Sequence, residues 1–451
     1  MRSVQPAPLT LRTAALLGLG AAACFHAAFS TPFGFLILGY IACLVQLARL
    51  RTARLSFYFG MAAGFFCFAP QLEFLWRIFG APALTLWAIL AFWIALFPAL
   101  FHVAFVRLGA LRAALLAPFL WTALEYFRSE LYYLRFSWLF AGYALSGACA
   151  PFNALGVYGI GFAAVLLLAL ISVRRFKLAV FTLILLLGYS TAVMFLRNPS
   201  SGSPLQVAGI QMEVPSEIEL VSNLGKLIKQ FPDAQLVVLS EYTLDGPVPN
   251  KLKQWCQKNR KYLVVGGKDP ASNAAWYDTA FVVGPTGEVV FKQAKSVPLQ
   301  LFDDGLPAKE QAVWNSPWGG IGICICYDLS YTRVTDRLIR LGAQALLVPT
   351  MDLKSWGGHE HELHRRIAQV RAAEYGVPIF RVGSSGISQS VNRLGREESS
   401  APFPGDGATL SATLKIGSPG RLPLDRVLCP LSVAIAAVFV ALTIVGFARR
   451  H

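Results

Sequence analysis

The apolar residues of this chain form long uninterrupted stretches before residue 200 and mostly short runs after it. Stretches of roughly 16 to 25 apolar residues have the length that a helix needs to cross the hydrocarbon core of a bilayer. The pattern predicts about eight transmembrane helices, at 14–29, 33–48, 56–72, 82–106, 111–127, 155–173, 178–196 and 427–447. The second span follows the first through the short segment STPFGF, so we expect an uncleaved helical hairpin rather than a signal peptide.

Between the seventh and eighth spans the pattern changes to short β-rich runs that alternate with amphipathic segments. Runs such as LQVAGIQMEV, AQLVVLSEYT, GGIGICICYD and AQALLVPT each end at a polar or turn-forming residue. Segments such as HELHRRIAQVRAAEYG carry apolar residues at helical spacing. This alternation predicts a layered α/β domain. We therefore expect a membrane domain over 1–200, an α/β domain over 204–415 and a C-terminal transmembrane helix over 427–448.

Composition and charge support a membrane protein and indicate its orientation. Hydrophobic residues make up 55% of the chain and charged residues 14%, whereas soluble domains carry about 25% charged residues. Basic residues gather in alternate loops between the predicted spans: Arg2, Arg12, Arg49, Arg51, Arg54, Arg107, Arg112, Arg174, Arg175, Lys177, Arg449 and Arg450. Such loops face the cytoplasm, which would leave both termini inside and the α/β domain outside. The same loops explain much of the net charge of +15, so we expect no nucleic-acid partner.

Two of the predicted strands stop at side chains that can do chemistry. Glu241 follows the run VVLS, and Cys326 with Asp328 follows the run GICI. Ligands of α/β sheets bind near the carboxyl ends of the strands, so we expect Glu241 and Cys326 to meet there. Cys324 lies inside its apolar run and is expected to be a small buried residue. The eight cysteines show no disulfide framework.

The segment HEHELHRR holds three histidines but does not match a metal-binding helix. The H-E-x-x-H pattern would need histidine at position 363, where the chain has Leu363. We therefore expect His359, His361 and His364 to lie in a solvated or lipid-facing loop and helix start, with no metal and no other cofactor. Trp356, just before this segment, is expected to contact the bilayer surface and the substrate.

The α/β region resembles the nitrilase superfamily in three motifs that stand in that family's order. LSEYT contains Glu241, FKQAKSVP contains a lysine, and ICYDLSY contains Cys326. The resemblance implies an αββα sandwich and a catalytic triad of Glu, Lys and Cys. Lys295, directly before SVP, is the favoured lysine, and Lys292 is the alternative. A later stretch, RAAEYGVPIFRVGSSGIS, is also similar to the family and suggests that Arg371 and Glu374 help to bind substrate.

The membrane half is similar to a membrane-embedded branch of that superfamily, the apolipoprotein N-acyltransferase family. The similarity rests on WTALEYFRSELYYLRFSWLFAGYAL, LGVYGIGF and STPFGFLILGYIA. It implies a monomer in the bacterial inner membrane whose catalytic domain lies on the periplasmic side. Such an enzyme transfers an acyl chain from a membrane phospholipid, through a cysteine thioester, to the α-amine of a diacylated apolipoprotein.

The resemblance also suggests supporting roles and shows where this chain departs from the family pattern. The backbone N–H of Tyr327 and the Lys295 ammonium would hold the oxyanion. Asp328 stands where the family usually has Glu, Asp303 stands where a loop glutamate is usual, and Ser384 replaces an Asn. These departures concern substrate preference more than the chemistry itself.

Two other functions compete with acyl transfer. One is a membrane-tethered amidase that hydrolyses a small or lipidic amide, and the other is an inactive subunit that only binds lipoproteins. Eight predicted spans favour an enzyme that draws its substrate from the membrane over a tethered amidase. An intact set of Glu241, Lys295 and Cys326 favours an enzyme over an inactive subunit.

Overall fold

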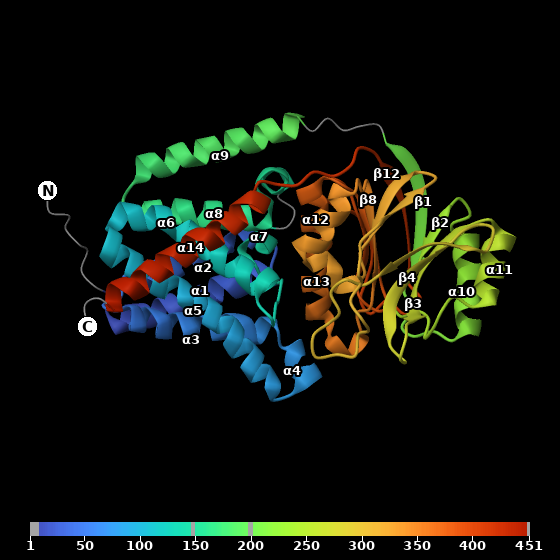
Figure 1. Cartoon of the computed structure of the whole chain (residues 1–451), viewed down its shortest axis with the longest axis horizontal. Coiled ribbons are helices and arrows are strands. Elements are labelled where there is room, and N and C mark those ends of the chain that lie inside the picture. Colours follow the sequence, from blue (N-terminus) through green and yellow to red (C-terminus); the bar gives the residue numbers. More distant parts are fainter. Residues whose placement is uncertain (1–8, 146–148, 197–201, 449–451) are drawn as a thin grey trace. The chain divides into compact units, whose positions relative to one another are not determined.

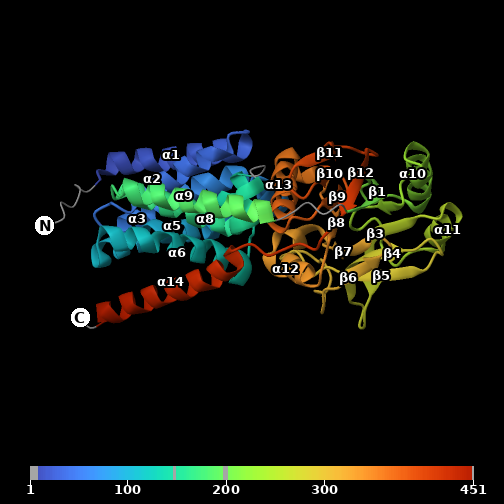
Figure 2. The ribbon, with the colours of Figure 1, turned by 90° about the horizontal axis from the view of Figure 1, so that it is seen from above.

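The computed structural model divides the chain into two compact units, which are described separately. The helical unit comprises residues 1–146, 154–196 and 423–451, and the α/β unit comprises residues 147–153 and 197–422. The structure describes residues 9–145, 149–196 and 202–448. Figures 1 and 2 show the helices of the first unit and the two sheets of the second.

Each of the eight predicted spans coincides with a helix of the helical unit. Its helices are α1 (Leu11–Ser30), η1 (Gly34–Leu36), α2 (Ile37–Leu47), α3 (Ala53–Gln71), α4 (Phe74–Phe79), α5 (Pro82–Leu108), α6 (Ala110–Tyr126), η2 (Phe127–Leu131), α7 (Ala141–Ala144), α8 (Cys149–Ser172, from residue 154 on), α9 (Phe176–Leu196) and α14 (Asp425–Ala448). Within the described residues, segments of α1, α5, α8, α9 and α14 are long and apolar enough to cross a membrane. The other three predicted spans, in α2, α3 and α6, fall short in length or hydropathy, so the number eight stays a prediction.

Small residues let α3 and α5 pack closely. A Cβ atom added at Gly60 would lie 2.9 Å from the Cα of Ala95, and one added at Gly64 would lie 2.9 Å from the Cα of Ala91. Such contacts between small residues are typical of helix pairs in membranes, where close backbone approach supplies much of the attraction. The pairing of α3 with α5 therefore depends on residues that carry little hydrophobicity of their own.

The last helix, α14, is joined to α8 by a buried carboxylate. Asp425, the first residue of α14, accepts a hydrogen bond from the backbone N–H of Tyr158 at 3.0 Å. The chain of α8 leaves helical geometry at Gly156, where φ is 78°, and a Cβ atom there would lie 2.1 Å from the Asp425 Oδ2. Glycine is therefore required at this kink, both for its backbone conformation and for space.

The α/β unit contains two six-stranded sheets, in the orders β12-β1-β2-β3-β4-β5 and β11-β10-β9-β8-β7-β6. Its strands are β1 (Ser203–Ile210), β2 (Leu236–Val238), β3 (Tyr262–Pro270), β4 (Trp276–Val283), β5 (Val289–Ala294), β6 (Val313–Ser316), β7 (Gly319–Ile323), β8 (Ala345–Thr350), β9 (Ile379–Gly383), β10 (Ser388–Val391), β11 (Glu397–Ala401) and β12 (Thr409–Ile416). The central strands β1, β2 and β3 are parallel, as are β7, β8 and β9.

Four main helices cover the outer faces of the sheets. They are α10 (Glu217–Gln230), α11 (Asn250–Asn259), α12 (Thr332–Arg340) and α13 (Gly358–Tyr375). Figure 1 shows α10 and α11 outside one sheet and α12 and α13 outside the other. The predicted αββα sandwich is therefore present.

The sequence explains why α10 covers its sheet. Leu220, Leu224 and Leu227 recur at helical spacing and are buried in one core cluster with residues of the sheet and of α11. Burial of each leucine contributes on the order of 2 kcal/mol. The helix begins where the Ser216 hydroxyl accepts a hydrogen bond from the backbone N–H of Glu219, as expected for an N-cap serine.

Candidate active site

Side chains that follow strands of both sheets meet in one buried site of the α/β unit. Glu241 follows β2, Lys295 follows β5 directly, and Cys326 follows β7. Met351, directly after β8, connects these groups. Its backbone N–H donates to the Glu241 Oε2 at 2.6 Å, and its carbonyl oxygen lies 3.8 Å from the Cys326 Sγ. The two sheets thus bring together residues that are up to 110 positions apart in the chain.

The Lys295 ammonium is surrounded by carboxylates. Its Nζ lies 2.7 Å from the Glu241 Oε1, 2.7 Å from the Asp304 Oδ2 and 3.6 Å from the Asp278 Oδ2. Burial opposes the charge on Lys295, but Glu241 and Asp304 hold the pKa of this ammonium well above its usual range. Burial, with Glu241 beside it, raises the pKa of Asp278 well above its usual range. The cluster therefore places one buried cation among three carboxyl groups.

Cys326 has a strained backbone and a buried thiol. It is the first residue of the 3-10 helix η3 (Cys326–Ser330), and its φ of 49° lies in the left-handed region. A residue other than glycine adopts that region at a cost of roughly 1–2 kcal/mol, and such strain often accompanies functional sites. Burial, followed by the charge of Glu241, raises the pKa of the Cys326 thiol, while Lys295 opposes this shift. The thiol therefore needs a base before it can act as a nucleophile.

Asp328 ties the Cys326 turn to the segment that carries Lys295. Its carboxylate accepts hydrogen bonds from the backbone N–H of Ser296 at 3.0 Å and of Val297 at 2.7 Å. Burial raises the pKa of Asp328 to about 6, against the effect of these N–H groups. Asp328 thus fixes the distance between two site residues. Tyr327, the next residue after Cys326, is buried in the same turn.

Arg371 and Glu374, both on α13, support the last residues of the same turn. Arg371 donates from Nε to the carbonyl oxygen of Leu329 at 3.0 Å and from Nη2 to that of Ser330 at 2.7 Å. Its Nη1 lies 2.5 Å from the Glu374 Oε2. Both side chains are fully buried. Arg371 and Glu374 therefore support the Cys326 turn, and a direct contact with substrate stays a prediction.

The structure distinguishes the two candidate lysines and corrects one carboxylate. Lys292 pairs with Asp269 at 2.9 Å on the surface, where about half of its side chain is exposed, whereas Lys295 pairs with Glu241. Asp303 is exposed, and its neighbour Asp304 takes the place that we predicted for it. Asp304 also accepts hydrogen bonds from the Tyr242 hydroxyl at 2.5 Å and from the backbone N–H of Leu299 at 2.6 Å.

Sequence reasoning missed Asp278 and Asp304. Asp278 lies in β4 and is completely buried. An acidic residue directly before the apolar run TAFVV was therefore a usable signal in the sequence. Asp304 lies in an irregular loop, where no periodicity distinguishes it from Asp303.

Trp356 is half-buried in the short helix η4 (Lys354–Trp356), on the segment that follows Met351.

The histidine segment is buried, so the prediction of a solvated or lipid-facing segment is wrong for two of its histidines. His361 is completely buried and His364 is 3% exposed. The His364 Nδ1 lies 2.8 Å from the Asp352 Oδ1, and the His361 Nδ1 lies 2.9 Å from the Glu360 Oε2. A ring nitrogen of His364, a carboxylate oxygen of Asp352 and the Cys326 Sγ all lie within 4.8 Å of one another.

Three groups of side chains in this region have donor atoms close enough to hold a metal ion. They are Cys326 with Asp352 and His364, Asp352 with Glu360 and His361, and Glu241 with Asp278 and Asp304. The last group already surrounds the Lys295 ammonium. In the first two groups, Asp352 also forms an ion pair with Arg381. Each of the three groups therefore contains a carboxylate that is paired with a lysine or an arginine.

Two family models match the chain along its length. The model described as the apolipoprotein N-acyltransferase N-terminal domain matches residues 21–171, and the carbon-nitrogen hydrolase model matches residues 207–403. An apolipoprotein N-acyltransferase of Shewanella oneidensis is 26% identical and aligns with 98% of this chain and 96% of its own length. The chain belongs to the apolipoprotein N-acyltransferase family. Its similarity therefore extends over both units.

Other similar proteins match a smaller share of this apolipoprotein N-acyltransferase family member. A deaminated glutathione amidase of Dictyostelium discoideum is 29% identical over 32% of this chain and 54% of its own length. The crystal structure of the Saccharomyces cerevisiae nitrilase-superfamily protein Nit3 covers 48% of this chain and 93% of its own, with 19% identity and a TM-score of 0.42. The apolipoprotein N-acyltransferase of Shewanella oneidensis, in contrast, aligns with nearly the whole chain.

Proposed function

We propose that this protein transfers a fatty acyl chain from a membrane phospholipid to the α-amine of the diacylglyceryl-cysteine of apolipoproteins. The observation that carries this proposal is the match to an apolipoprotein N-acyltransferase over 98% of the chain, helical unit included. The buried cluster of Glu241, Lys295 and Cys326 supports it, because acyl transfer through a thioester needs a thiol, a base and an oxyanion partner.

In the first half-reaction, Glu241 takes the proton from the Cys326 Sγ. The thiolate attacks the ester carbonyl of the phospholipid, so that a C–S bond forms and the carbonyl oxygen becomes an oxyanion. Lys295 and the backbone N–H of Tyr327 stabilise this oxyanion. When it collapses, the ester C–O bond breaks, Glu241 returns the proton to the leaving lysophospholipid, and an acylated Cys326 remains. The raised pKa of the Cys326 thiol explains why the base must be adjacent.

In the second half-reaction, the neutral α-amine of the acceptor attacks the thioester. An N–C bond forms and the C–S bond breaks. Glu241 takes the amine proton and passes it to the sulfur, which restores the thiol. The mechanism is ping-pong, because the lysophospholipid leaves before the acceptor reacts. The hydrogen bonds of Asp328 to the Lys295 segment and of Arg371 to the Cys326 turn support the same geometry in both half-reactions.

We further propose the membrane arrangement predicted from the sequence. Residues 1–200 and 427–448 form a membrane domain of eight helices in the bacterial inner membrane, and residues 204–415 form the catalytic domain on the periplasmic side of a monomer. The alternate Arg-rich loops support this orientation. The five long apolar helices support insertion into a membrane.

A membrane-tethered amidase is the second candidate function. The carbon-nitrogen hydrolase match supports it, since amidases of this superfamily share the α/β unit. An amidase function would give no role to the helical unit, whose residues 21–171 match their own family model. Water would replace the lipoprotein amine in the second half-reaction.

The proposal is tested with purified protein, a phospholipid labelled in its acyl chain and a synthetic diacylglyceryl-cysteine peptide. We expect label on the enzyme before the peptide is added and on the peptide amine afterwards. A matched peptide with an acetylated α-amine serves as the control and should accept no acyl chain. Release of free fatty acid with no transfer to the peptide would support the amidase instead.

A further inference from the structure

The proposed acyl transfer requires more proton handling than Glu241 provides. An α-amine has an ordinary pKa of about 7.7–8.0, so at neutral pH most acceptor molecules carry an additional proton and cannot attack. That proton must leave before attack, and the second must leave during it. Both Glu241 oxygens are engaged, one with Lys295 at 2.7 Å and one with the Met351 N–H at 2.6 Å. Glu241 can therefore accept only one of the two protons.

His364 stands where a second base is needed. A His364 ring nitrogen lies within 4.8 Å of the Cys326 Sγ, the atom that carries the acyl group. Its Nδ1 is 2.8 Å from the Asp352 Oδ1. Because a carboxylate accepts a hydrogen bond, this contact holds a proton on Nδ1 and leaves the lone pair of neutral imidazole on Nε2. Histidine is the side chain best suited to exchange protons near neutral pH.

Asp352 is built to remain charged beside this histidine. It is completely buried and forms an ion pair with Arg381, and its backbone N–H donates to the Ser384 Oγ at 3.1 Å. Burial opposes the charge of Asp352, but the Arg381 guanidinium beside it holds the pKa of this carboxyl well below its usual range. A fixed anion stabilises an imidazolium as it forms, which is the role of the carboxylate in serine-histidine-aspartate triads.

We propose that His364, oriented by Asp352, accepts the first proton of the acceptor ammonium, so that the neutral amine can attack the Cys326 thioester. This inference rests on the proposed acyl transfer. The ammonium N–H bond breaks and an imidazolium N–H bond forms, and the imidazolium later releases its proton to water. The amine proton lost during attack still goes to Glu241. Among the residues that the structure describes, the titratable and charged groups around His364 include Cys326, Asp352, Glu360, His361 and Arg381.

The test measures the two half-reactions of a His364→Gln variant separately. At about pH 6.5 we expect transfer to the diacylglyceryl peptide to fall roughly hundredfold, while acylation of Cys326 by labelled phospholipid changes by less than about threefold. The transfer defect should shrink to a few-fold near pH 9, where the acceptor amine is already neutral. Hydroxylamine, which is neutral at pH 7, should cleave both acyl-enzymes at the same rate.

His361→Gln is the matched control, because His361 is buried on the same helix. Its ring nitrogen is grouped with Asp352 and Glu360 and not with Cys326. This variant should affect both half-reactions alike and show no selective loss of transfer at pH 6.5 that recovers near pH 9. An equal loss in both half-reactions of His364→Gln at every pH would reduce His364 to a structural role and overturn the inference. Normal transfer at pH 6.5 would overturn it too. If the unchanged protein forms no acyl-enzyme at all, the proposed function itself fails.

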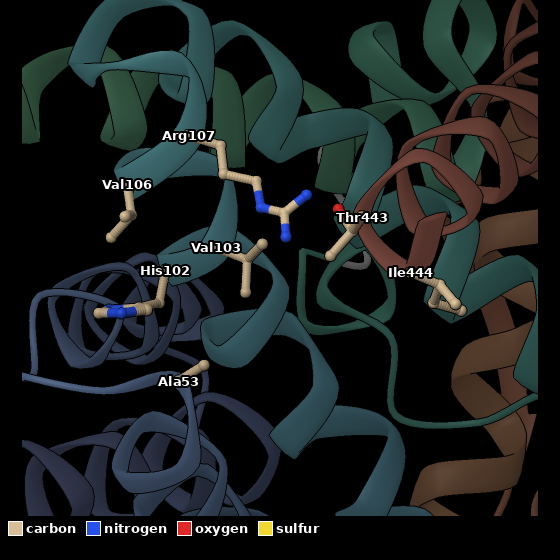
Figure 3. Close-up of a pocket in the computed structure, with 7 residues that line it drawn as sticks. All are labelled: Ala53, His102, Val103, Val106, Arg107, Thr443 and Ile444. Atoms are coloured by element: carbon tan, nitrogen blue, oxygen red, sulfur yellow. The ribbon is translucent and has the colours of Figure 1, made fainter. Parts of the chain in front are cut away.

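A second and independent site lies in the helical unit. A pocket of about 460 Å³ opens between the C-terminal ends of α5 and α14, beside the first residue of α3 (Figure 3). Its walls are mostly apolar and include Val103, Val106 and Ile444. Figure 3 shows Arg107 of α5 extending toward Thr443 of α14. The pocket therefore combines an apolar wall with a guanidinium at its edge.

Arg107 is exposed, and no ion pair with a carboxylate is present for it among the residues that the structure describes. A Cβ atom added at Gly446 would lie 3.2 Å from the Arg107 Nη1, so the guanidinium reaches the α14 backbone. The α14 span is only 11% buried inside the protein. Something outside the protein must therefore cover the apolar side of α14 near Arg107.

We infer that an anionic phospholipid occupies this pocket, with an acyl chain along the apolar wall and its phosphate on Arg107. Guanidinium groups bind phosphate through paired hydrogen bonds, and basic pockets between transmembrane helices are typical binding sites for anionic headgroups. A lipid held by both helices would fasten α14 to α5. This inference does not depend on the acyl-transfer reaction.

The test adds phosphatidylglycerol or phosphatidylcholine with identical acyl chains to the full-length protein in detergent. We expect phosphatidylglycerol to raise the thermal midpoint by several degrees and to remain bound in native mass spectrometry, and phosphatidylcholine to do neither. Arg107→Gln should lose both effects, and Arg112→Gln, which changes an exposed arginine outside the pocket, should keep them. Equal effects of the two lipids, the same shift with inorganic phosphate, or loss only in Arg112→Gln would overturn the inference.

Discussion

At the scale of single residues, the site is organised around one buried ammonium. Lys295 contacts carboxylates from three different segments, namely Glu241, Asp278 and Asp304. Removal of one partner of such a buried cluster leaves an unpaired charge, which typically costs 3–5 kcal/mol. Variants of these residues therefore need a folding control in every activity measurement.

The role of Lys295 is tested by Lys295→Met, with Lys292→Met as the matched control. We expect Lys295→Met to block formation of the acyl-enzyme by about a hundredfold or more, because the oxyanion loses its cation. Lys292→Met should be mild, since Lys292 pairs with Asp269 at the surface. The measurement is trapping of labelled enzyme before any acceptor is added. Normal trapping in Lys295→Met with none in Lys292→Met would reverse the assignment.

Alanine variants of Cys326 and Cys324 test which of the two cysteines is the nucleophile. We expect Cys326→Ala to abolish both the acyl-enzyme and labelling by a thiol-reactive lipid analogue. Cys324 is completely buried, so Cys324→Ala should retain most activity and lose on the order of 1 kcal/mol of stability. Activity that survives in Cys326→Ala would remove the thioester from the mechanism.

His361 gives the α/β unit a predictable dependence on pH. Burial opposes its protonation, but hydrogen bonds with Asp352 and Glu360 raise its pKa to about 9. This folded-state pKa exceeds the unfolded value of about 6.5, so the stability that protonated His361 contributes is complete below about pH 6.5 and is lost as the pH rises through about 9. Thermal unfolding of the protein and of His361→Gln should therefore differ less at about pH 10 than at about pH 6. A constant difference would contradict the assignment.

At the scale of elements, the kink of α8 determines how the last helix is attached. Gly156→Ala would force a Cβ atom into the Asp425 carboxylate and a positive φ on alanine. We expect a loss of roughly 2 kcal/mol or more and a thermal midpoint lower by several degrees. Gly188→Ala in α9 is the control, because a Cβ atom there meets nothing within 4 Å. It should be neutral or slightly stabilising, since alanine favours helices.

At the scale of the whole molecule, the orientation in the membrane follows from the basic loops. A reporter inserted near Gly305 should be detected outside the cytoplasm, and one fused after Arg450 should be detected inside it, because Arg-rich loops remain cytoplasmic. Alkaline phosphatase and fluorescent-protein fusions provide the two readouts. A cytoplasmic signal from the Gly305 insertion would contradict both the topology and the lipoprotein substrate.

Local sequence pattern determined which segments become helices and strands, and it located Glu241 and Cys326. The reason is that an apolar run records burial directly, and the residue at which a buried strand stops stands at the edge of its sheet. The order of the motifs was sufficient to indicate the family. None of this required knowledge of which segments far apart in the chain become neighbours.

Tertiary structure decided the remaining questions. Lys295 rather than Lys292 reaches Glu241 because β5 ends just before it, and Asp304 rather than Asp303 turns inward in a loop that has no periodicity. His364 looked polar and exposed in sequence, yet Asp352, from the end of another strand, compensates its burial. A charged residue can be buried only where a partner meets it. Pairing of that kind arises from the packing of separate segments, which a local pattern does not contain.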